Sequence, residues 1–401
     1  MISPKERYLA RGVSSTKDEV YDAISILDQG LYPGAFCTIV PDFAGEGSMS
    51  SVMHTDDVGT KTSLAYIAWR ENFGDQIWFG IAQDCAVMNL DDCACVGATG
   101  PFWFSNTIAR NAKRIPGSIL KAILDGYHKL FRSLSIEGIE CNLLGGETSD
   151  CGDIVRTLFV ESTVMARLRR EQVIDASRIL PGDLIVSFSS YGQARWEDRP
   201  NSGIGSNGLT DARHQMLSGK YADNYPETFA PEVDRNLIYC GKYSLQDPLP
   251  GDSSLSIGEA LLSPTRTYLP MIKLMLSRMP AREIHALIHC TGGGQTKIIR
   301  YGGLRGGGLR YVKERLLPIP PIFQALKEST GQSLWEMYKV YNMGALLEAV
   351  VPEVGAESCL AAAKECHIDA TISGYVERTG TADNEVIIRA DGEVHRYNAK
   401  T

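Results

Sequence analysis

The stretch His54-Thr55-Asp56-Asp57-Val58-Gly59-Thr60-Lys61 places two carboxylates, a glycine, a hydroxyl and an ammonium group in one short segment. The mostly apolar residues 51–53 precede it, and the apolar pattern of residues 64–66 that follows is typical of a helix. We therefore expect a strand-to-helix connection here, where backbone N–H groups and a helix N-terminus favour anions. The alternative is a solvated turn that an aspartate caps.

The length and composition indicate an ordinary globular protein. A chain of 401 residues, 44% of them hydrophobic and 22% charged, is long enough for two domains of roughly 100–200 residues each. Its net charge of −8 argues against a nucleic-acid partner, which usually requires a basic face. Residues 1–7 lack the apolar core of a signal peptide, and no apolar run approaches the ~20 residues of a membrane span. We therefore predict a cytoplasmic protein without a nucleic-acid or membrane partner.

The ten cysteines are scattered along the chain and include no C-x-x-C pair. Cys93 and Cys95 are the closest two, and they lack the usual spacing of zinc ligands. The pattern predicts reduced, mostly buried thiols rather than disulfides or a metal site. His285 and His289 fall in a segment that reads as a strand, where they are too far apart to chelate a metal readily.

Apolar periodicity predicts alternating helices and strands. The expected helices span Lys17–Gln29, Asp84–Cys95 and a long segment after Pro116, and the expected strands span Gln76–Ile81, Thr157–Ala166 and Leu184–Phe188. Along the second of these helices, the carboxylates of Asp84, Asp91 and Asp92 share a face. A polar stretch at 168–182 separates two apolar systems, so we predict one domain of residues 1–172 and another of residues 173–401.

Three carboxylates of the first half, Asp56, Asp92 and Glu147, each lie at the end of an apolar element. Glu147 follows Gly145 and Gly146, which allow another group to approach the backbone closely. Converging carboxylates are costly without a cation, and hard oxygen ligands favour Mg²⁺. Because Mg²⁺ usually retains water and phosphate oxygens, the set predicts a site for a magnesium-bound nucleoside triphosphate.

The second half contains glycine-rich turns that suit phosphate. Gly203–Gly208 matches the dinucleotide pattern G-x-G-x-x-G, but the long polar segment 191–200 separates it from the preceding strand and disfavours NAD binding. Ser206-Asn207-Gly208 instead reads as a capped helix start, a suitable site for a phosphate monoester. Gly292-Gly293-Gly294 exposes backbone behind a strand, and Arg266 is either a phosphate ligand or a surface arginine.

Taken in order, these segments resemble the PurM-like family, most closely its phosphoribosylformylglycinamidine cyclo-ligases, also called aminoimidazole ribonucleotide synthetases. The family's T-D-G-V-G-T-K, N-D-x-x-x-x-G-A and G-G-E-T are similar to Thr55–Lys61, Asp91–Ala98 and Gly145–Thr148. Its S-N-G, L-x-P-T-R-x-Y, H-x-T-G-G-G and F-N-x-G are similar to Ser206–Gly208, Leu262–Tyr268, His289–Gly294 and Tyr341–Gly344. The resemblance runs from Gly12 to the last strands, and this many colinear motifs make chance a poor explanation.

The resemblance implies a two-domain α/β (α+β) fold. The strands of its N-terminal domain would complete a barrel across a homodimer interface, and its C-terminal α/β domain would close over the site. The implied ATP and Mg²⁺ ligands are Asp56, Gly59, Thr60, Lys61, Asp92 and Glu147, with the metal on Asp56, Asp92 and Glu147. The residues implied to face a ribonucleotide substrate are Ser206, Asn207, Gly208, Arg266, Gly292, Gly293, Gly294 and Asn342. The implied catalytic residues are Lys61, Asp92 and His289.

The reaction implied by the resemblance converts formylglycinamidine ribonucleotide and ATP to aminoimidazole ribonucleotide, ADP and phosphate, in de novo purine biosynthesis. A formamide oxygen is a poor leaving group, so ATP would activate it before a neighbouring nitrogen closes the ring. Positioning and charge neutralisation suffice for this task, which agrees with a chain without an evident nucleophilic Ser or Cys constellation.

The sequence departs from the family's motifs at a few positions. Asp57 stands where the family usually has glycine, Asp91 where it has asparagine, and Gly205 where a histidine is common. The segment Tyr191–Pro200 reads as an insertion. The alternatives are another ATP-using relative, such as a formylglycinamidine synthetase subunit, thiamine monophosphate kinase or selenophosphate synthetase, or a non-catalytic nucleotide-binding protein. Cys37 lacks the nearby loop lysine of selenophosphate synthetases, which disfavours that alternative.

Overall fold

The computed structural model describes residues 4–14, 20, 23–24, 26–303 and 308–398. Within them the chain forms two main β-sheets, one from each half of the sequence, and a small two-stranded sheet. Residues 17–19, 21–22 and 25 of the helix predicted at Lys17–Gln29 lie outside the described residues. No helix in the described ranges is long and apolar enough to cross a membrane.

The five-stranded sheet of the first half, sheet A, has the strand order β1-β2-β5-β3-β4. Its strands in this order are β1 (Ile39–Pro41), β2 (Met49–Asp57), β5 (Leu158–Arg169), β3 (Phe102–Arg110) and β4 (Cys141–Asp150). β2 and β3 both run antiparallel to the central β5, and β4 runs parallel to β3. The carboxyl ends of β2, β3 and β4 therefore lie at the same end of the sheet.

The seven-stranded sheet of the second half, sheet B, has the order β14-β13-β10-β12-β6-β11-β9. Its strands in this order are β14 (Glu393–Asn398), β13 (Glu385–Ala390), β10 (Leu309–Lys313), β12 (Ala370–Arg378), β6 (Leu184–Ser189), β11 (Ala345–Val351) and β9 (Ala286–His289). β7 (Pro248–Leu249) and β8 (Asp252–Ser256) form the small sheet. Every residue of β11 is buried, because the strand lies between β6 and β9 and α12 packs against it.

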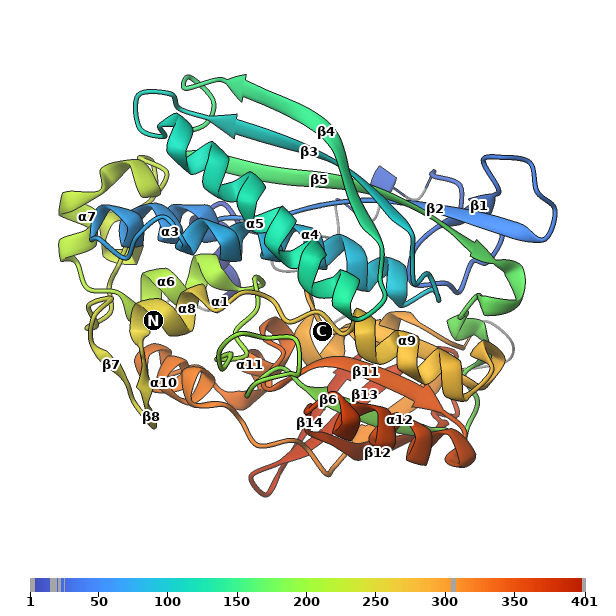
Figure 1. Ribbon diagram of the computed structural model, residues 1–401. Helices are drawn as coiled ribbons and strands as arrows, with labels where there is room; N and C mark the ends of the chain where they lie inside the picture. The colour runs from blue at the N-terminus through green and yellow to red at the C-terminus, as the bar shows by residue number, and fades with distance from the viewer. Residues whose placement is uncertain (1–3, 15–19, 21–22, 25, 304–307, 399–401) are drawn as a thin grey trace.

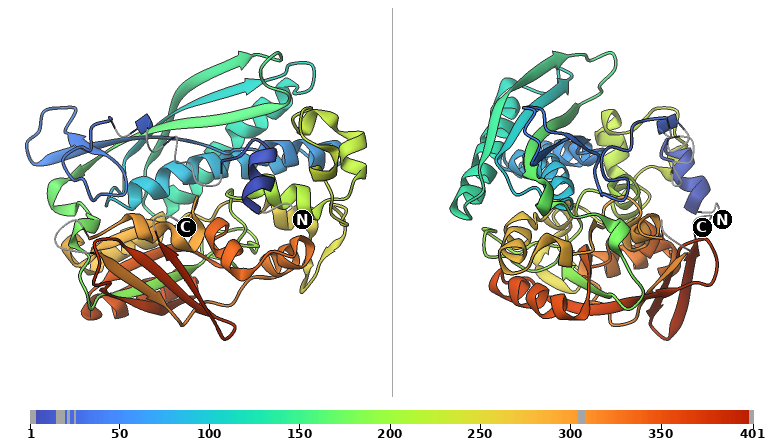
Figure 2. Two further views of the ribbon diagram at one scale, coloured as in Figure 1. Left: turned by 180° about the vertical axis from the view of Figure 1, so that it is seen from behind. Right: turned by 90° about the vertical axis from the view of Figure 1, so that its right-hand side faces the viewer.

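Figures 1 and 2 show the two main sheets on the outside of the molecule, with most helices between them. The α-helices are α1 (Pro4–Ala10), α3 (Lys61–Arg70), α4 (Ile77–Ala94), α5 (Gly117–Ile136), α6 (Leu209–Met216), α7 (Lys220–Asn224), α8 (Ile257–Leu262), α9 (Leu269–Arg278), α10 (Pro321–Thr330), α11 (Leu334–Val340) and α12 (Glu353–Glu365). α4 contacts α9, and α3 contacts α6 and α8, so helices of the two halves meet along one seam.

Helix α4 corrects one prediction. The segment Gln76–Ile81, expected as a strand, forms the first turn of α4, which begins at Ile77. Fourteen of the 18 residues of α4 are buried, because the helix lies between sheet A and the second half of the chain. A helix that is apolar on most sides loses the amphipathic period, so its aromatic and β-branched start is easily mistaken for a strand.

Other predicted elements are confirmed. β2 ends and α3 begins on either side of the segment 58–60, which is the expected strand-to-helix connection. The long helix after Pro116 is α5, and the strands expected at Thr157–Ala166 and Leu184–Phe188 are β5 and β6.

The N-terminal segment complicates the proposed domain boundary. Arg11 is nearly buried, and its guanidinium pairs with Asp211 of α6 and donates to the Leu237 carbonyl. Arg7 of α1 lies 3.3 Å from the same carboxylate. Helix α1 and Arg11 are therefore attached to the second half. The last strand of sheet A along the chain, β5, ends at Arg169, and the first strand of sheet B, β6, begins at Leu184.

Candidate active site at the seam between the two halves

The connection after β2 is closed by its own carboxylates. The Asp57 N–H donates to Asp56 Oδ1 at 2.8 Å, and the Gly59 N–H donates to Asp57 Oδ1 at 2.5 Å. Gly59 has φ +57°, a left-handed conformation that glycine adopts at little cost. Thr60 is exposed at the N-cap of α3, and its side chain caps none of the helix N–H groups. The start of α3 therefore remains available to an anion.

Two helix N-termini meet at this connection. The Thr60 hydroxyl lies 2.6 Å from the hydroxyl of Thr210, which belongs to the first turn of α6. Gly208, with φ +78°, is the N-cap of α6, so the predicted Ser206-Asn207-Gly208 helix start is confirmed. Because both helix dipoles present their positive ends here, the positive potential of the two halves adds at one place.

Asp56 and Asp92 form the acidic part of the site. Alternation along β2 places Asp56 on the same face as His54, toward α4, which carries Asp92 near its C-terminal end. Burial and the nearby charge of Asp92 raise the pKa of the Asp56 carboxyl. A pair in which Asp92 disfavours the charge of Asp56, near two helix N-termini, suits a hard divalent cation with phosphate oxygens.

Asp57 lies on the opposite face of sheet A from Asp56. The register places it in one row with Glu161 of β5, Thr107 of β3 and Glu147 of β4. Paired residues of neighbouring strands share a face, so this row lies on the face away from α4. Asp57, the unexpected residue of the motif, therefore closes the turn through Gly59 and does not join the Asp56–Asp92 pair.

Glu147 is not brought to the other two predicted metal ligands within one chain. Glu147 is exposed on β4, at the end of the row that begins with Asp57. Three strand spacings of about 4.8 Å each put roughly 14 Å between the backbones of β2 and β4. It also lies on the other face of sheet A from Asp56.

His289 lies against Asp92 from the second half of the chain. Its Nδ1 is 2.7 Å from Asp92 Oδ1, and its ring is completely buried at the end of β9. Burial opposes ionisation of Asp92, but the hydrogen bond from His289 and the charge of Lys297 outweigh it and lower the pKa of the Asp92 carboxyl. His289 Nε2 is buried and has no hydrogen-bond partner among the described residues.

Lys61 is a link between the two halves. Its ammonium is completely buried and donates to Asp84 Oδ1 at 3.0 Å and to the carbonyls of Gly205 and Ser263 at 3.0 and 2.7 Å. Burial lowers the pKa of Lys61, and the charge of Asp84 opposes this shift. In this arrangement all three N–H groups of the ammonium are used by acceptors of the protein.

The carboxylates of α4 bind the segment that precedes α9. Asp84 accepts hydrogen bonds from the Thr265 N–H and hydroxyl, both at 2.7 Å, and from the Ser206 hydroxyl at 2.9 Å. Asp91 accepts from the Thr267 hydroxyl and the Tyr268 N–H. Burial raises the pKa of Asp91 to about 6. The shared acidic face predicted for this helix is therefore largely an attachment surface for the second half.

Arg266 is buried and is bound by the inserted segment. Its Nε and Nη2 donate to the two carboxylate oxygens of Glu197 at 2.9 and 2.6 Å. Its remaining donors reach the carbonyls of Ser189, Tyr191 and Gly192. Of the two readings of this residue, a surface arginine is wrong, because Arg266 is only 1% exposed. The Arg266 guanidinium therefore holds the segment 191–197 in place against the rest of the second half.

The remaining predicted substrate residues shape loops around the seam. The Asn342 amide donates to the Gly203 carbonyl at 2.9 Å and accepts from the Ser190 hydroxyl, so it holds the loop before Ser206. Gly294 has φ +49°, and an added Cβ would lie 2.4 Å from the Tyr341 carbonyl, so only glycine fits. The amide of Asn207 lies close to Gly292, which brings the two glycine-rich turns side by side.

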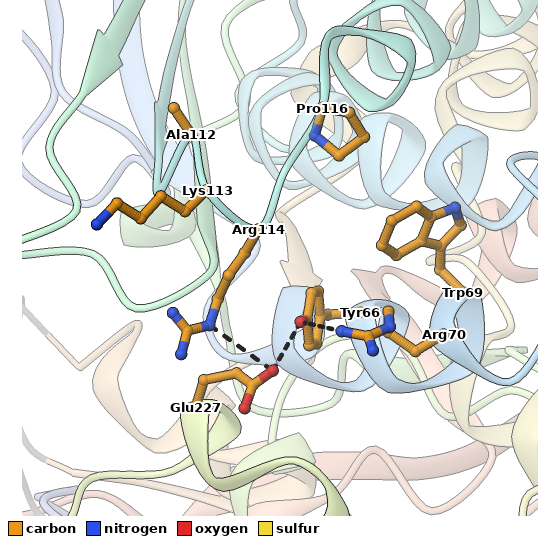
Figure 3. Close-up of a pocket in the computed structure, with 8 residues that line it drawn as sticks. All are labelled: Tyr66, Trp69, Arg70, Ala112, Lys113, Arg114, Pro116 and Glu227. Carbon is orange, nitrogen blue, oxygen red and sulfur yellow. Dashed lines mark hydrogen bonds and ion pairs between the residues drawn. The ribbon is translucent and has the colours of Figure 1, made fainter.

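A charged groove lies away from these residues, beside the C-terminal half of α3 (Figure 3). It has a volume of about 520 Å³. Its lining residues are Tyr66, Trp69, Arg70, Ala112, Lys113, Arg114, Pro116 and Glu227. Glu227 accepts from the Tyr66 hydroxyl at 2.6 Å and lies 3.7 Å from Arg114 Nε. None of the site residues predicted from the sequence lines this groove.

Sequence reasoning missed some residues that the structure brings to the site. Glu197 lies in a segment interpreted only as an insertion, and no local pattern shows that Arg266 is its partner. His54 belongs to the decisive stretch, and the strand period places it beside Asp56, so alternation would have found it. Cys37 was considered only in the comparison with selenophosphate synthetases. It precedes β1 and reaches Asp92 only through the folding of sheet A, so no local pattern predicted this contact.

Comparisons with known proteins agree with this architecture. The family model described as AIR synthase related protein, N-terminal domain, matches residues 37–168, and the corresponding C-terminal domain model matches residues 181–385. The phosphoribosylformylglycinamidine cyclo-ligase of Methanosarcina mazei is 28% identical over 363 residues, which cover 87% of this chain and 90% of that protein. The enzyme of that name from Methanococcus vannielii is 27% identical over 400 residues, covering 100% and 96%.

Solved structures share the fold at low sequence identity. A chain of the HypE–HypF complex superposes with a TM-score of 0.58 and 15% identity, covering 95% of this chain and 99% of that chain. AaThiL complexed with AMPPCP and TMP gives a TM-score of 0.54 and 13% identity, covering 95% and 94%. These likenesses show a mixed α/β two-domain fold of the PurM-like type. With the match of the two domain models, the chain belongs to the AIR synthase-related protein family.

Proposed function

We propose that this protein uses ATP to close the imidazole ring of aminoimidazole ribonucleotide, starting from formylglycinamidine ribonucleotide and releasing ADP and phosphate. The observation that carries the proposal is the position of the Asp56–Asp92 pair beside the meeting N-termini of α3 and α6. The relatives named as cyclo-ligases, at 27–28% identity over most of the chain, support this choice of reaction. A structure of HypE in complex with ATP, with a TM-score of 0.53, supports a nucleotide as one ligand.

The residues present fit Mg-ATP. Asp56 and Asp92 would hold Mg²⁺, because a divalent cation offsets the burial and the Asp92 charge that raise the pKa of Asp56. Bound Mg-ATP would supply the phosphoryl group that makes the formyl oxygen a leaving group. Thr60 and the free N–H groups at the start of α3 would bind phosphate oxygens. The site needs no covalent nucleophile, since orientation and charge neutralisation carry the reaction.

The second half would hold the ribonucleotide. Asn207 and the Gly292–Gly294 turn face each other at the start of α6, where backbone N–H groups suit a phosphate monoester. We assign Lys61, Arg266 and Asn342 positioning roles, because their polar groups are bonded within the protein. His289 would orient and neutralise Asp92 through its Nδ1.

A second copy of the chain would complete the site. Glu147 is exposed on the face of sheet A that α4 and α5 leave uncovered, where Met53 is 61% exposed. We propose that two such faces meet in a homodimer and that Glu147 serves the metal site of the partner subunit.

The decisive experiment incubates the full-length protein with ATP, Mg²⁺ and formylglycinamidine ribonucleotide and measures aminoimidazole ribonucleotide and ADP. Equal amounts of both products are expected. A known cyclo-ligase verifies the substrate in parallel, and absence of the ring product from the test protein would contradict the proposal. Ser206→Ala should raise the KM for the ribonucleotide more than that for ATP, and the opposite pattern would assign this loop to the nucleotide.

A second candidate is an ATP-dependent reaction of the same superfamily on a different substrate. The observation that favours it is the pairing of Arg266 with Glu197, which removes a predicted ligand of the ribonucleotide. In the same assay this candidate predicts tight Mg-ATP binding without ring closure. Thiamine monophosphate in place of the ribonucleotide, with ADP release as the readout, tests the kinase version.

A further inference from the structure

Three side chains of different kinds meet beside Asp56. They are Cys37, which lies just before β1, His54 of β2 and Asp92 of α4. One ligand atom from each, a thiol sulfur, an imidazole nitrogen and a carboxylate oxygen, lies within 4.8 Å of the others. The Cys37 thiol also donates to the main-chain carbonyl of Asp92 at 3.1 Å, which fixes the loop against α4. The fold therefore gathers three metal-ligating groups that are far apart in the sequence.

Hydrogen bonds around His54 decide which ring nitrogen faces the others. Asn89 uses its amide N–H groups on the carbonyls of Cys85 and Ser162, both at 3.1 Å. Its oxygen therefore faces His54 Nδ1, at 3.0 Å, and as an acceptor it requires a proton on that nitrogen. In the neutral ring the lone pair is then on Nε2, the nitrogen that faces Asp92 Oδ2 at 3.5 Å.

The contact between His54 Nε2 and Asp92 Oδ2 is favourable only with a positive charge between the two atoms. A lone pair and a carboxylate oxygen repel each other at that distance unless a proton or a cation lies between them. Asp92 Oδ1 is already bonded to His289, so the second oxygen is the one directed at the shared space. The hydrogen bond that His54 donates to Asn89 and the one between His289 and Asp92 thus orient two of the three ligands, as outer partners do in metal centres.

The ligand types distinguish this cluster from the Asp56–Asp92 pair. Thiolate and imidazole are ligands of Zn²⁺ and related transition metals, whereas Mg²⁺ prefers an all-oxygen shell. Three protein ligands leave a fourth position of a tetrahedral ion for water or a substrate atom. His54 retains 21% side-chain exposure, which provides a route for the ion, while Cys37 and Asp92 are buried.

We propose that Cys37, His54 and Asp92 form a binding site for a transition metal of the Zn²⁺ type, with Asn89 and His289 as its outer hydrogen-bond partners. Binding replaces the thiol proton of Cys37, which passes to water, so each bound ion releases one proton from the sulfur. Burial and the nearby charge of Asp92 raise the pKa of the Cys37 thiol, and the Lys297 ammonium, held by the Thr291 hydroxyl at 2.7 Å, opposes this shift. Cysteine spacing predicted no metal site, and the site arises instead from one cysteine and two other ligand types.

The site shares Asp92 with the proposed magnesium site. A Zn²⁺ ion on Asp92 would occupy the oxygen that Mg²⁺ needs, so the two ions should compete. The inference itself does not depend on the proposed reaction, because the three ligands converge without nucleotide or substrate.

The test titrates metal-free, full-length protein with Co²⁺ in the absence of nucleotide. Binding is expected at one ion per chain, with the visible bands of four-coordinate Co²⁺ and a near-ultraviolet sulfur-to-metal charge-transfer band. Zn²⁺ should displace Co²⁺ and abolish both signals. Absence of the charge-transfer band at saturating Co²⁺ would overturn the proposal.

Variants locate the site. Cys37→Ser should lose the charge-transfer band, and His54→Gln should weaken Co²⁺ binding. Asn89→Asp, which keeps an acceptor for His54, should retain binding, whereas Asn89→Leu should weaken it by about 10–100-fold. Cys240→Ser, which changes an exposed thiol elsewhere, is the matched control and should behave as the unchanged protein.

The outcomes separate this proposal from the proposed function. Circular dichroism and the melting temperature establish that each variant is folded. A charge-transfer band that survives in folded Cys37→Ser would place the metal elsewhere and reject the site. Co²⁺ binding without cyclo-ligase activity would reject the proposed reaction and leave the metal site intact. Cyclo-ligase activity without Co²⁺ binding would reject the metal site and support the proposed reaction.

Discussion

Lys61 and Asp84 form an ion pair with an Nζ–Oδ2 distance of 2.9 Å, and neither side chain is exposed to solvent. Lys61 begins α3 and Asp84 lies inside α4, while the lysine also binds two carbonyls of the second half. The pair therefore stabilises the decisive strand-to-helix connection and the seam at the same time.

Removal of one partner of the Lys61–Asp84 pair should lower the free energy of unfolding. Lys61→Met leaves the Asp84 charge buried with only neutral donors, so we expect a loss of about 3–5 kcal/mol in the free energy of unfolding. Chemical denaturation measures this loss. Lys121→Met, which breaks the exposed pair with Asp125 on α5, is the control and should cost at most about 0.5 kcal/mol. Equal effects of the two variants would contradict the buried pair's role.

The Arg266–Glu197 fork should determine the order of the inserted segment. Glu197→Ala leaves a buried guanidinium without its carboxylate, and we expect a loss of about 3 kcal/mol or more in the free energy of unfolding. Limited proteolysis should then cut within residues 191–200. Asp198→Ala removes an exposed partner of Lys129 in the same segment and should leave both readouts unchanged.

The two neighbouring aspartates of the opening motif should differ in nucleotide binding. Asp56→Asn and Asp92→Asn should each weaken Mg-ATP binding at least tenfold, about 1.4 kcal/mol, while the fold is retained. Asp57→Asn should change it less than twofold, because Asp57 faces the other side of sheet A. Isothermal titration calorimetry measures the three affinities. An equal loss in Asp57→Asn would return this residue to the metal site.

Acid stability should depend on Asp42, which follows β1. The Arg167 guanidinium donates to both oxygens of Asp42 and holds the pKa of that carboxyl below its usual range, against the opposing effect of burial. A depressed folded pKa contributes stability above the unfolded value, near pH 4, and this contribution is lost as the pH falls. The melting temperature of Asp42→Asn should therefore fall less between pH 6 and 3 than that of the unchanged protein. Parallel curves would exclude this contribution.

The uncovered face of sheet A should carry the dimer contact. Met53→Arg places a charge on this face, and we expect the homodimer to dissociate in light scattering coupled to size-exclusion chromatography. Ile136→Arg, at an 86% exposed position at the end of α5, should leave the oligomeric state unchanged. A monomeric unchanged protein would reject the interface and the role of Glu147 in a partner's site.

Much of the fold follows from local patterns. The β2–α3 connection, α5, β5, β6 and the start of α6 were predicted because each has a clear period or capping signal within a few residues. For α4, only the part from Asp84 onward was predicted as a helix, because burial on most sides of this helix removes the contrast between its faces. The motifs also identified Asp56, Asp92 and His289, which the structure places together at the seam.

The sequence by itself predicted the two-part α/β organisation and the family, and it supplied the residues of the proposed magnesium and phosphate site. The tertiary structure decided which groups are paired. Strand register put Asp57 and Asp56 on opposite faces. The approach of the two halves engaged the donors of Lys61, and contacts within the second half engaged those of Arg266. It also joined Cys37 to His54 and Asp92. Such pairings depend on contacts between residues far apart in the chain, and a sequence pattern describes only the periodicity of neighbours.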